Sequence, residues 1–330
     1  MAERSRWSVT GIAEWAAVAM LGKLLDWLPA PVAYGLGERA GRLAYRMDHR
    51  HRAVAAENLA AAFPGQYPPL ELDQLVRSVF ENLGRTAVDV ARSGRLFSGA
   101  GEPTFRFDGL ECLKEASARG KGVLVLTAHF GPWELLTAFG ALCYEPFHIV
   151  ARPLDNPRLD DLLTSLRERG GNLVIRKREA VQAILQVLRR GKTVGILIDQ
   201  HISEREGVVV PFFGRPASTA AAPALIALRS GAVVLPAGIT REAGRGCYRV
   251  VAGPEIPVRR SGDLKADLVE NTARFNRAIE TLIRERPDQW FWVHRRWKTR
   301  QPLDPLYRPG AGRPAGDQTD ALEAPERGTT

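Results

Sequence analysis

One short stretch of the sequence combines residue types and a spacing that suit the catalysis of group transfer. It reads Thr127-Ala-His-Phe-Gly-Pro-Trp-Glu134, so His129 and Glu134 stand five residues apart. A histidine can take a proton from a hydroxyl group. A carboxylate that accepts a hydrogen bond from the other ring nitrogen orients the ring and stabilises its charged form. The pair therefore predicts activation of a hydroxyl for attack on an acyl group.

The residues around this pair predict the elements that position it. Residues 123–127 form a short apolar run, typical of a strand buried on both faces, and His129 follows this run almost directly. Gly131 permits a tight turn, and Pro132 suits the first position of a helix, which places Glu134 in that helix's first turn. Ligands of open α/β sheets bind beyond the carboxyl ends of the strands. We therefore expect His129 and Glu134 at a ligand crevice.

The rest of this region alternates between apolar runs and helical periods. Further runs that predict strands cover residues 147–151, 173–175, 193–198, 233–239 and 248–252. Helical spacing recurs over residues 132–142, 159–169, 181–191 and 264–287. This alternation predicts an α/β fold in which a mostly parallel central sheet is flanked by helices.

Two other predicted strands end in residues that suit substrate binding. Arg152 follows the strand at residues 147–151, and it is either a partner for a phosphate or oxyanion or a plain surface cation. Asp199 and Gln200 follow the strand at residues 193–198. Asp199 is expected to bind acceptor hydroxyls or to hold Arg152, with a helix cap as the structural alternative. We take Arg152, Asp199 and Gln200 as candidate substrate-binding residues.

The N-terminal part predicts helices that contact a membrane surface. Residues 12–28 are apolar but short for a membrane span. Three charged residues interrupt them: Glu14, Lys23 and Asp26. The tryptophans near this stretch suit the headgroup boundary: Trp7, Trp15 and Trp27. These features favour an interfacial helix, with packing on the protein's own core or a true span as the alternatives.

Two further segments carry the same ambiguity between membrane contact and packing. Residues 36–52 alternate arginines with apolar side chains at helical spacing, which is typical either of a membrane-surface helix or of a solvated face. A tryptophan segment, residues 290–298, also contains His294 and three basic side chains. This segment predicts either an interfacial anchor or packing against the end of the sheet.

Charge and composition narrow the classes of partner. The chain has 330 residues and a net charge of +9, and 39 of its 46 basic residues are arginines. Such a surface suits nucleic acid, an anionic membrane or a phosphorylated substrate. Zinc-finger spacing and RNP-like aromatic motifs are absent from the sequence, so nucleic acid is not expected. The three cysteines form no CxxC pair, and no Walker A or HExxH motif occurs, so neither a metal nor a cofactor is expected.

Five segments in order along the chain resemble one known family. They are His129-Phe-Gly-Pro-Trp-Glu134, Ala151-Arg-Pro153 with Asn156-Pro157, Gly195-Ile-Leu-Ile-Asp199-Gln200, Phe212-Phe-Gly214 with Pro216-Ala217, and the tryptophan segment. The chain resembles the bacterial lipid A biosynthesis (lauroyl/myristoyl) acyltransferases, within the lysophospholipid and glycerolipid acyltransferase superfamily. Phe212-Phe-Gly214 is expected to pack in the core or along an acyl channel rather than to do chemistry.

This resemblance implies a membrane-associated α/β acyltransferase that uses an acyl thioester, with acyl carrier protein as the usual donor and acyl-CoA as the other. It implies that His129 and Glu134 form the catalytic dyad. The acceptor is then a hydroxyl of a lipid A precursor, reached at the cytoplasmic face of the inner membrane. Phosphatidylinositol mannoside acyltransferases resemble the same family, so another glycolipid acceptor is the nearest alternative. A non-catalytic, lipid-binding peripheral membrane protein is the alternative from another class.

Composition along the chain predicts three regions. Residues 1–100 form a helical, membrane-associating region, and residues 101–305 form the α/β core. Residues 306–330 are rich in glycine, proline, alanine and charge without periodicity, which is typical of a disordered tail.

Overall fold

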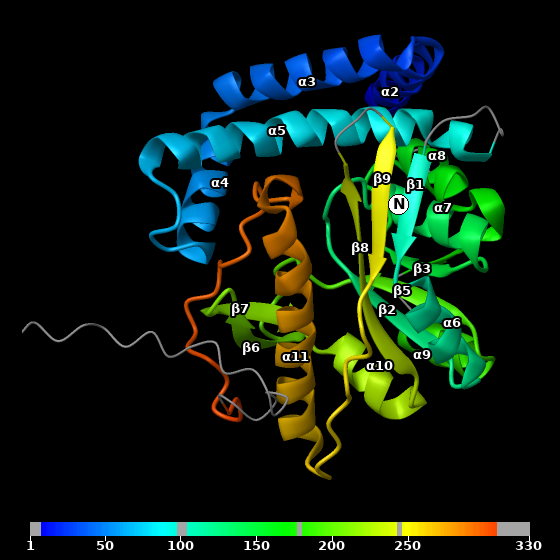
Figure 1. Ribbon diagram of the computed structural model, residues 1–330, viewed down its shortest axis with the longest axis vertical. Helices are drawn as coiled ribbons and strands as arrows, with labels where there is room; N and C mark the ends of the chain where they lie inside the picture. The colour runs from blue at the N-terminus through cyan, green and yellow to red at the C-terminus, as the bar shows by residue number, and fades with distance from the viewer. Residues whose placement is uncertain (1–7, 98–103, 177–179, 243–245, 309–330) are drawn as a thin grey trace, which may run out of the picture.

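The computed structural model of the protein describes residues 8–97, 104–176, 180–242 and 246–308. A twisted sheet stands at the centre, helices cover both of its faces, and a further layer of helices crosses one end of the strands (Figure 1). The expected α/β fold, with a helical N-terminal region, is therefore confirmed. The expected tail from residue 309 onward lies outside the described residues, and the division into three regions stays a prediction.

The main sheet has seven strands in the order β1-β9-β8-β2-β5-β3-β4. Their bounds in that order are β1 (Thr104–Asp108), β9 (Cys247–Ala252), β8 (Val233–Arg241), β2 (Val123–Thr127), β5 (Thr193–Leu197), β3 (His148–Ala151) and β4 (Leu173–Arg176). The five strands from β8 to β4 run parallel, whereas β9 is antiparallel to β8 and parallel to β1. The parallel set brings the carboxyl ends of β2, β3 and β5 to one edge of the sheet.

The parallel strands form because their side chains are buried on both faces of the sheet. Every residue of β2 and of β8 is buried. On one face the strands pack against α6 (Leu110–Ala118) and α7 (Glu134–Cys143). On the other face they pack against α9 (Ala180–Arg189), α10 (Ala222–Ser230) and α11 (Leu264–Glu285). All six strands that the apolar runs predict are present in this sheet.

Three strands lack such runs and were not predicted. Strand β1 alternates apolar and polar residues, because it lies at the edge of the sheet and half of its surface faces solvent. The other two form a separate hairpin, β6 (Gly207–Phe212) and β7 (Arg215–Ala220). Its two-residue turn has positive φ at both Phe213 (49°) and Gly214 (72°), the backbone that such hairpins require. Phe212 and Phe213 are buried, so the expectation of a core position for them is confirmed.

Four helices build the N-terminal layer: α2 (Val9–Trp27), α3 (Ala30–Met47), α4 (His49–Ala62) and α5 (Pro69–Arg92). Helices α3 and α5 cross at glycines, where a Cβ atom on Gly84 would lie 2.0 Å from the carbonyl oxygen of Gly37. Arg92 of α5 donates hydrogen bonds to the carbonyl oxygens of Leu25, Asp26 and Leu28, and so it satisfies the last turn of α2. This layer lies at the end of the sheet to which β8 points (Figure 1).

Helix α2 also reaches the parallel strands through α8 (Pro157–Arg167), which follows β3. The Asn156 side chain donates to the Gly11 carbonyl oxygen at 2.9 Å, and the Arg158 guanidinium lies 5.5 Å from the centre of the Trp15 ring. No helix within the described residues combines the length and the apolar content that a membrane crossing requires.

Candidate active site

His129 lies just beyond the carboxyl end of β2, as the sequence predicted. The chain turns at Gly131, whose φ is +57°, and a Cβ atom there would lie 2.1 Å from the Ile239 carbonyl oxygen of β8. Helix α7 begins three residues later at Glu134. The expected arrangement of strand, turn and helix is confirmed, and it leaves the His129 side chain 22% exposed at the edge of the sheet.

The partner of the His129 ring is Asp199, which follows the neighbouring strand β5. His129 Nδ1 lies 2.8 Å from Asp199 Oδ1, and the His129 backbone N–H donates to Asp199 Oδ2 at 2.9 Å. The Trp290 indole N–H donates to the same Oδ2 at 2.7 Å. The Asp199 side chain is only 1% exposed. A buried carboxylate with three hydrogen bonds therefore sets the position and the tautomer of the ring.

Charge and burial oppose each other at this pair. Burial raises the pKa of the Asp199 carboxyl, but the charge and the hydrogen bonds of His129, with that of Trp290, lower it below its usual range. Burial lowers the pKa of His129, whereas the charge and hydrogen bond of Asp199 and the charge of Glu134 raise it, and the net pKa is above that of an ordinary histidine. The site therefore favours an imidazolium, the form that His129 takes when it removes a proton.

The other nitrogen of His129 lies next to an exposed side chain. Nε2 lies 3.3 Å from the amide nitrogen of Gln200, an exposed side chain. The ring packs in a cluster with two aromatic side chains: its centroid lies 5.2 Å from that of Trp133 and 6.1 Å from that of Phe291, and those two are 6.1 Å apart. Because Nδ1 donates to Asp199, Nε2 carries the lone pair of the neutral ring, and the Gln200 amide N–H donates to it at 3.3 Å. The acceptor atom of His129 therefore lies beside an exposed side chain, and in this tautomer it can accept a proton.

Glu134 is placed differently from the expectation that it orients His129. Its carboxylate accepts two hydrogen bonds from Arg167 of α8, at 2.7 and 2.6 Å, and one from the Trp133 indole at 3.2 Å. The side chains of Glu134 and Arg167 are both 15% exposed. The orienting hydrogen bond at His129 comes from Asp199 instead, because β5 lies directly beside β2 and its end faces the ring. The negative charge of Glu134 still raises the pKa of His129.

The remaining candidates also follow strands that end at this edge. Arg152 follows β3 directly and is exposed, and within the described residues it forms no ion pair with Asp199. The Asp199 side chain is buried, and its hydrogen bonds come from His129 and Trp290. Gln200 is exposed next to His129. The residues that the sequence did not single out as part of the site are Arg167, Trp133, Phe291 and Trp290.

The tryptophan segment packs against the end of the sheet, and the interpretation of this segment as an interfacial anchor is wrong for its first half. Trp290 is 1% exposed and Trp292 is fully buried. The backbone N–H of Phe291 donates to the His129 carbonyl oxygen at 3.0 Å. His294 Nε2 accepts a hydrogen bond from the His201 backbone N–H at 3.1 Å. The segment therefore forms one wall of the site.

Comparison with known proteins identifies what this architecture is similar to. Residues 2–299 match the family model described as bacterial lipid A biosynthesis acyltransferase. The chain is 29% identical over 289 residues to the lipid A biosynthesis palmitoleoyltransferase of Escherichia coli (strain K12), covering 87% of this chain and 92% of the relative. It is 29% identical over 293 residues to the lipid A biosynthesis lauroyltransferase of the same organism, covering 87% and 91%.

The chain is also similar to an acyltransferase that is named for another acceptor. The phosphatidylinositol mannoside acyltransferase of Mycolicibacterium smegmatis (strain ATCC 700084 / mc(2)155) is 25% identical over 280 residues, covering 83% of this chain and 88% of the relative.

Proposed function

Since the chain belongs to the bacterial lipid A biosynthesis acyltransferase family, and so to a family of transferases, we propose that it moves a fatty acyl chain from a thioester to a hydroxyl of a lipid A precursor. The observation that carries the proposal is the pairing of His129 Nδ1 with a buried carboxylate, while Nε2 of the partly exposed ring lies beside the exposed Gln200 side chain. That geometry suits a general base for a hydroxyl nucleophile.

In the proposed reaction the acceptor hydroxyl gives its proton to His129 Nε2 as its oxygen attacks the thioester carbonyl carbon. The imidazolium that forms is stabilised by Asp199, which lies 2.8 Å from Nδ1. The carbon–sulfur bond then breaks, and the leaving thiolate takes the proton from Nε2. The products are an ester and a free thiol, and because the acceptor is the nucleophile, no acyl-enzyme is formed.

Glu134 and Arg167 supply a second, fixed set of charges beside this base. Their bidentate pair is held between α7 and α8, and the Glu134 charge adds to that of Asp199 in favouring the imidazolium. We propose that Glu134 contributes to catalysis through this field and through the position of Arg167. The family resemblance implied a His129–Glu134 dyad, and the proposal extends this dyad to include Asp199.

Arg152 and Gln200 are the proposed substrate contacts, because both are exposed beside the base. The guanidinium of Arg152 at the end of β3 suits a phosphate of the acceptor or carrier. The amide of Gln200, 3.3 Å from His129 Nε2, lies where the acceptor hydroxyl must arrive. Asp199, which the sequence suggested as a substrate ligand, is instead proposed to hold the base.

We propose that the molecule meets the inner membrane, at its cytoplasmic face, through an apolar N-terminal face on α2 and α3. This face consists of exposed large apolar side chains: Val18, Met20, Leu21, Leu24, Trp27, Val32, Leu36, Leu43 and Met47. Trp27 is 78% exposed and Met20 is 67% exposed. Exposed arginines flank the face on α3, which suits anionic headgroups. Because α2 contacts α8 beside the active-site edge, a lipid acceptor in the bilayer would be close to His129.

The similarity to a phosphatidylinositol mannoside acyltransferase supports a second acceptor class with the same chemistry. An incubation of the purified full-length protein separates the two. Laurate is offered as its acyl carrier protein or CoA thioester, with either a tetraacylated lipid A precursor or a phosphatidylinositol mannoside, and products are weighed by mass spectrometry. We expect laurate to appear on the lipid A precursor, with the carrier protein as the better donor. Transfer only to the mannoside establishes the second candidate, and no transfer from either donor to either acceptor contradicts the proposed activity.

A further inference from the structure

The carboxylate that holds His129 depends on a hydrogen bond from a residue ninety-one positions away in the chain. Trp290 is 1% exposed, and its indole N–H lies 2.7 Å from Asp199 Oδ2. We propose that Trp290 is a positioning residue, whose buried N–H fixes the Asp199 carboxylate and thereby the general base His129. This inference rests on the proposed function for its kinetic consequences, but its structural part can be measured without turnover.

Main-chain hydrogen bonds on both sides of Trp290 join it to the loop that carries His129. The Phe291 N–H donates to the His129 carbonyl oxygen at 3.0 Å, and the Gly131 N–H donates to the Gln289 carbonyl oxygen at 2.8 Å. Trp290 itself forms a bridge with Phe130. The indole and the imidazole are therefore placed by one local antiparallel pairing, so that neither moves alone.

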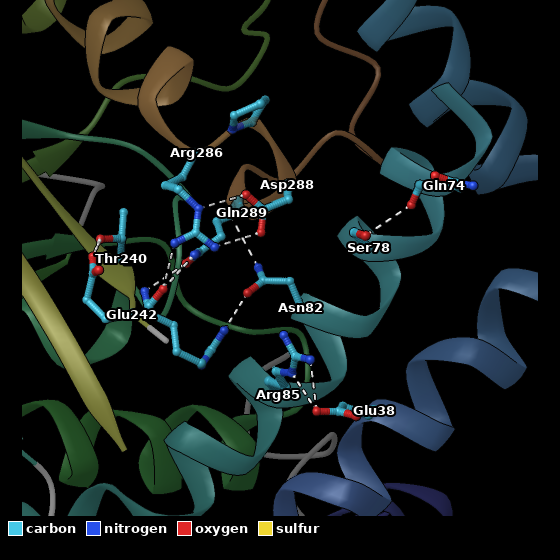
Figure 2. A network of polar contacts seen from close by, with 12 residues as sticks. Glu38, Gln74, Ser78, Asn82, Arg85, Thr240, Glu242, Arg286, Asp288 and Gln289 are labelled. Atoms are coloured by element: carbon cyan, nitrogen blue, oxygen red, sulfur yellow. Dashed lines mark hydrogen bonds and ion pairs between the residues drawn. The ribbon is translucent and has the colours of Figure 1, made fainter. Parts of the chain in front are cut away.

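The preceding residue, Gln289, ties the tryptophan segment to the end of β8 and to α5. Its side chain accepts a hydrogen bond from the Arg241 backbone N–H and donates one to the Arg241 carbonyl oxygen, both at 2.9 Å. The Asn82 side chain of α5 donates to the Gln289 carbonyl oxygen, as Figure 2 shows. An ion pair between Arg286 and Asp288 closes the same turn. These contacts fix the backbone just before Trp290.

The ring of Trp290 is also held from the side. Trp292 packs perpendicular to it with centroids 4.5 Å apart, and Phe212 lies at 5.5 Å. Asn58 of α4 donates to the carbonyl oxygens of Trp292 and His294, at 2.7 and 2.8 Å. The aromatic cluster gives the indole one orientation, and in that orientation its N–H meets Asp199.

Several elements that pack around Asp199 and His129 carry charged or titratable side chains. Glu134 of α7 and Arg167 of α8 face His129, whereas the fully buried Arg296 and the nearby His294 face Asp199. Burial lowers the pKa of His294 to about 4, so that ring stays neutral at working pH. Lys298 acts on His294 rather than on the pair. None of these groups donates a hydrogen bond to the Asp199 carboxylate, as far as the described residues extend.

Loss of the Trp290 N–H is expected to change the pKa of His129 in one direction. When His129 is neutral, the pair carries a net negative charge, and when His129 is protonated the pair is neutral overall. An N–H donor at Asp199 stabilises the negative form more strongly. Removing that donor therefore raises the pKa of His129, and the proton-accepting form is lost at a higher pH than in the wild type.

The test compares Trp290→Phe with Tyr34→Phe as the control. Each substitution removes the hydrogen-bond donor of a buried aromatic side chain from a buried carboxylate, but the Tyr34 hydroxyl donates to Asp89 Oδ1 at 2.6 Å and not to Asp199. The first readout is the pH titration of the His129 ring, followed by NMR of the full-length protein labelled with ¹⁵N-histidine and assigned with His129→Ala. The second is the pH dependence of kcat/KM for acyl transfer.

We expect Trp290→Phe to raise the midpoint of the His129 titration by about one pH unit and to lower kcat/KM at neutral pH about tenfold. Tyr34→Phe is expected to leave both the midpoint and kcat/KM unchanged, whatever its effect on thermal stability. If Trp290→Phe folds and titrates like the wild type, or if both variants shift alike, the positioning role is overturned. If Trp290→Phe shifts the His129 titration but the wild-type protein transfers no acyl group, the proposed function is contradicted and the positioning role of Trp290 stands.

A second variant covers the case in which Trp290→Phe does not fold. Trp290→His keeps a ring N–H and is expected to retain the wild-type midpoint. A shifted midpoint in that variant overturns the proposal.

Discussion

The two tryptophan-bearing regions of the chain look alike as sequence and differ in their surroundings. On the apolar N-terminal face, Trp27 is 78% exposed, at the end of a helix whose exposed side chains are mostly apolar. In the tryptophan segment, Trp290 is 1% exposed and donates a hydrogen bond to the carboxylate behind the base. The same type of side chain therefore lies on an outer surface in one region and beside the proposed catalytic centre in the other.

This difference shows that the elements packed around a tryptophan, rather than its local sequence, determine whether the side chain is exposed or buried. Helix α2 packs on α5 and α8 with only one of its residues buried, because it lies at the rim of the helical layer. The first half of the tryptophan segment lies between the carboxyl end of β2 and the β6–β7 hairpin, where Trp290 and Trp292 are buried. Basic residues accompany both regions, so charge alone does not distinguish them.

The comparison between the two regions can be tested by substitution. The largest loss of activity is expected in the buried region, at Asp199. Asp199→Asn removes the charge that raises the pKa of His129 and favours the wrong ring tautomer. We expect kcat to fall about 10²–10⁴-fold. The acid limb of the pH–rate profile is expected to move to lower pH, opposite to the shift for Trp290→Phe.

Steady-state transfer assays between pH 5 and 9 check this prediction. Asp155→Asn is the control, because Asp155 is exposed after β3, close to the same edge of the sheet. An Asp199→Asn variant with the wild-type acid limb would place the electrostatic partner of His129 elsewhere, with Glu134 as the first residue to test.

The next largest effect is expected on the apolar N-terminal face. The double substitution Leu21→Ser with Trp27→Ser removes two exposed apolar side chains of α2. If both enter the bilayer, each contributes about tenfold to binding, so vesicle affinity is expected to fall about 10²-fold. Transfer to a detergent-dispersed acceptor is expected to stay unchanged, because neither residue touches the site.

Sedimentation with vesicles that contain anionic lipid measures the binding. Leu264→Ser is the control, since Leu264 is also half exposed but lies at the start of α11, at the opposite end of the molecule in Figure 1. Equal binding by the double variant and the wild type would show that another surface contacts the membrane.

The smallest effect is expected at Arg152, between the two regions. Arg152→Lys keeps the positive charge but loses the two-pronged hydrogen bonding of a guanidinium. We expect KM for the acceptor to rise several-fold, up to about tenfold, with little change in kcat, the pattern of a contact made equally in ground and transition states. A fall in kcat at constant KM assigns Arg152 to the oxyanion, and Arg152→Lys and Arg152→Ala variants that both match the wild type remove it from the site.

The fold was predictable where burial leaves a strong local pattern. The strands that are covered on both faces, such as β2 and β8, are continuous apolar runs and were predicted. Strand β1 is an edge strand, and the β6–β7 hairpin contains two prolines and a positive-φ phenylalanine, so neither carries that signal. Their positions depend on partners far away in the sequence.

The sequence predicted which residues lie at the carboxyl ends of the strands, but not which of them contact one another. His129, Asp199 and Arg152 each follow a predicted strand, and parallel strands bring their ends to one edge. The order of the strands was not available from the apolar runs, and β5, rather than α7, supplies the partner of the ring. The pairing of Glu134 with Arg167 and the hydrogen bond from Trp290 are long-range contacts without a local pattern.

The central claim is that His129 is the base for acyl transfer. It is tested most directly by the turnover of purified, folded His129→Ala, with acyl carrier protein thioester and lipid A precursor, next to the wild type and His49→Ala. His49 is an exposed histidine of α4, so its removal controls for the loss of an imidazole away from the site. We predict that His129→Ala loses at least about 10²–10⁴-fold in kcat while His49→Ala retains full activity. Turnover of His129→Ala near the wild-type rate would contradict the mechanism.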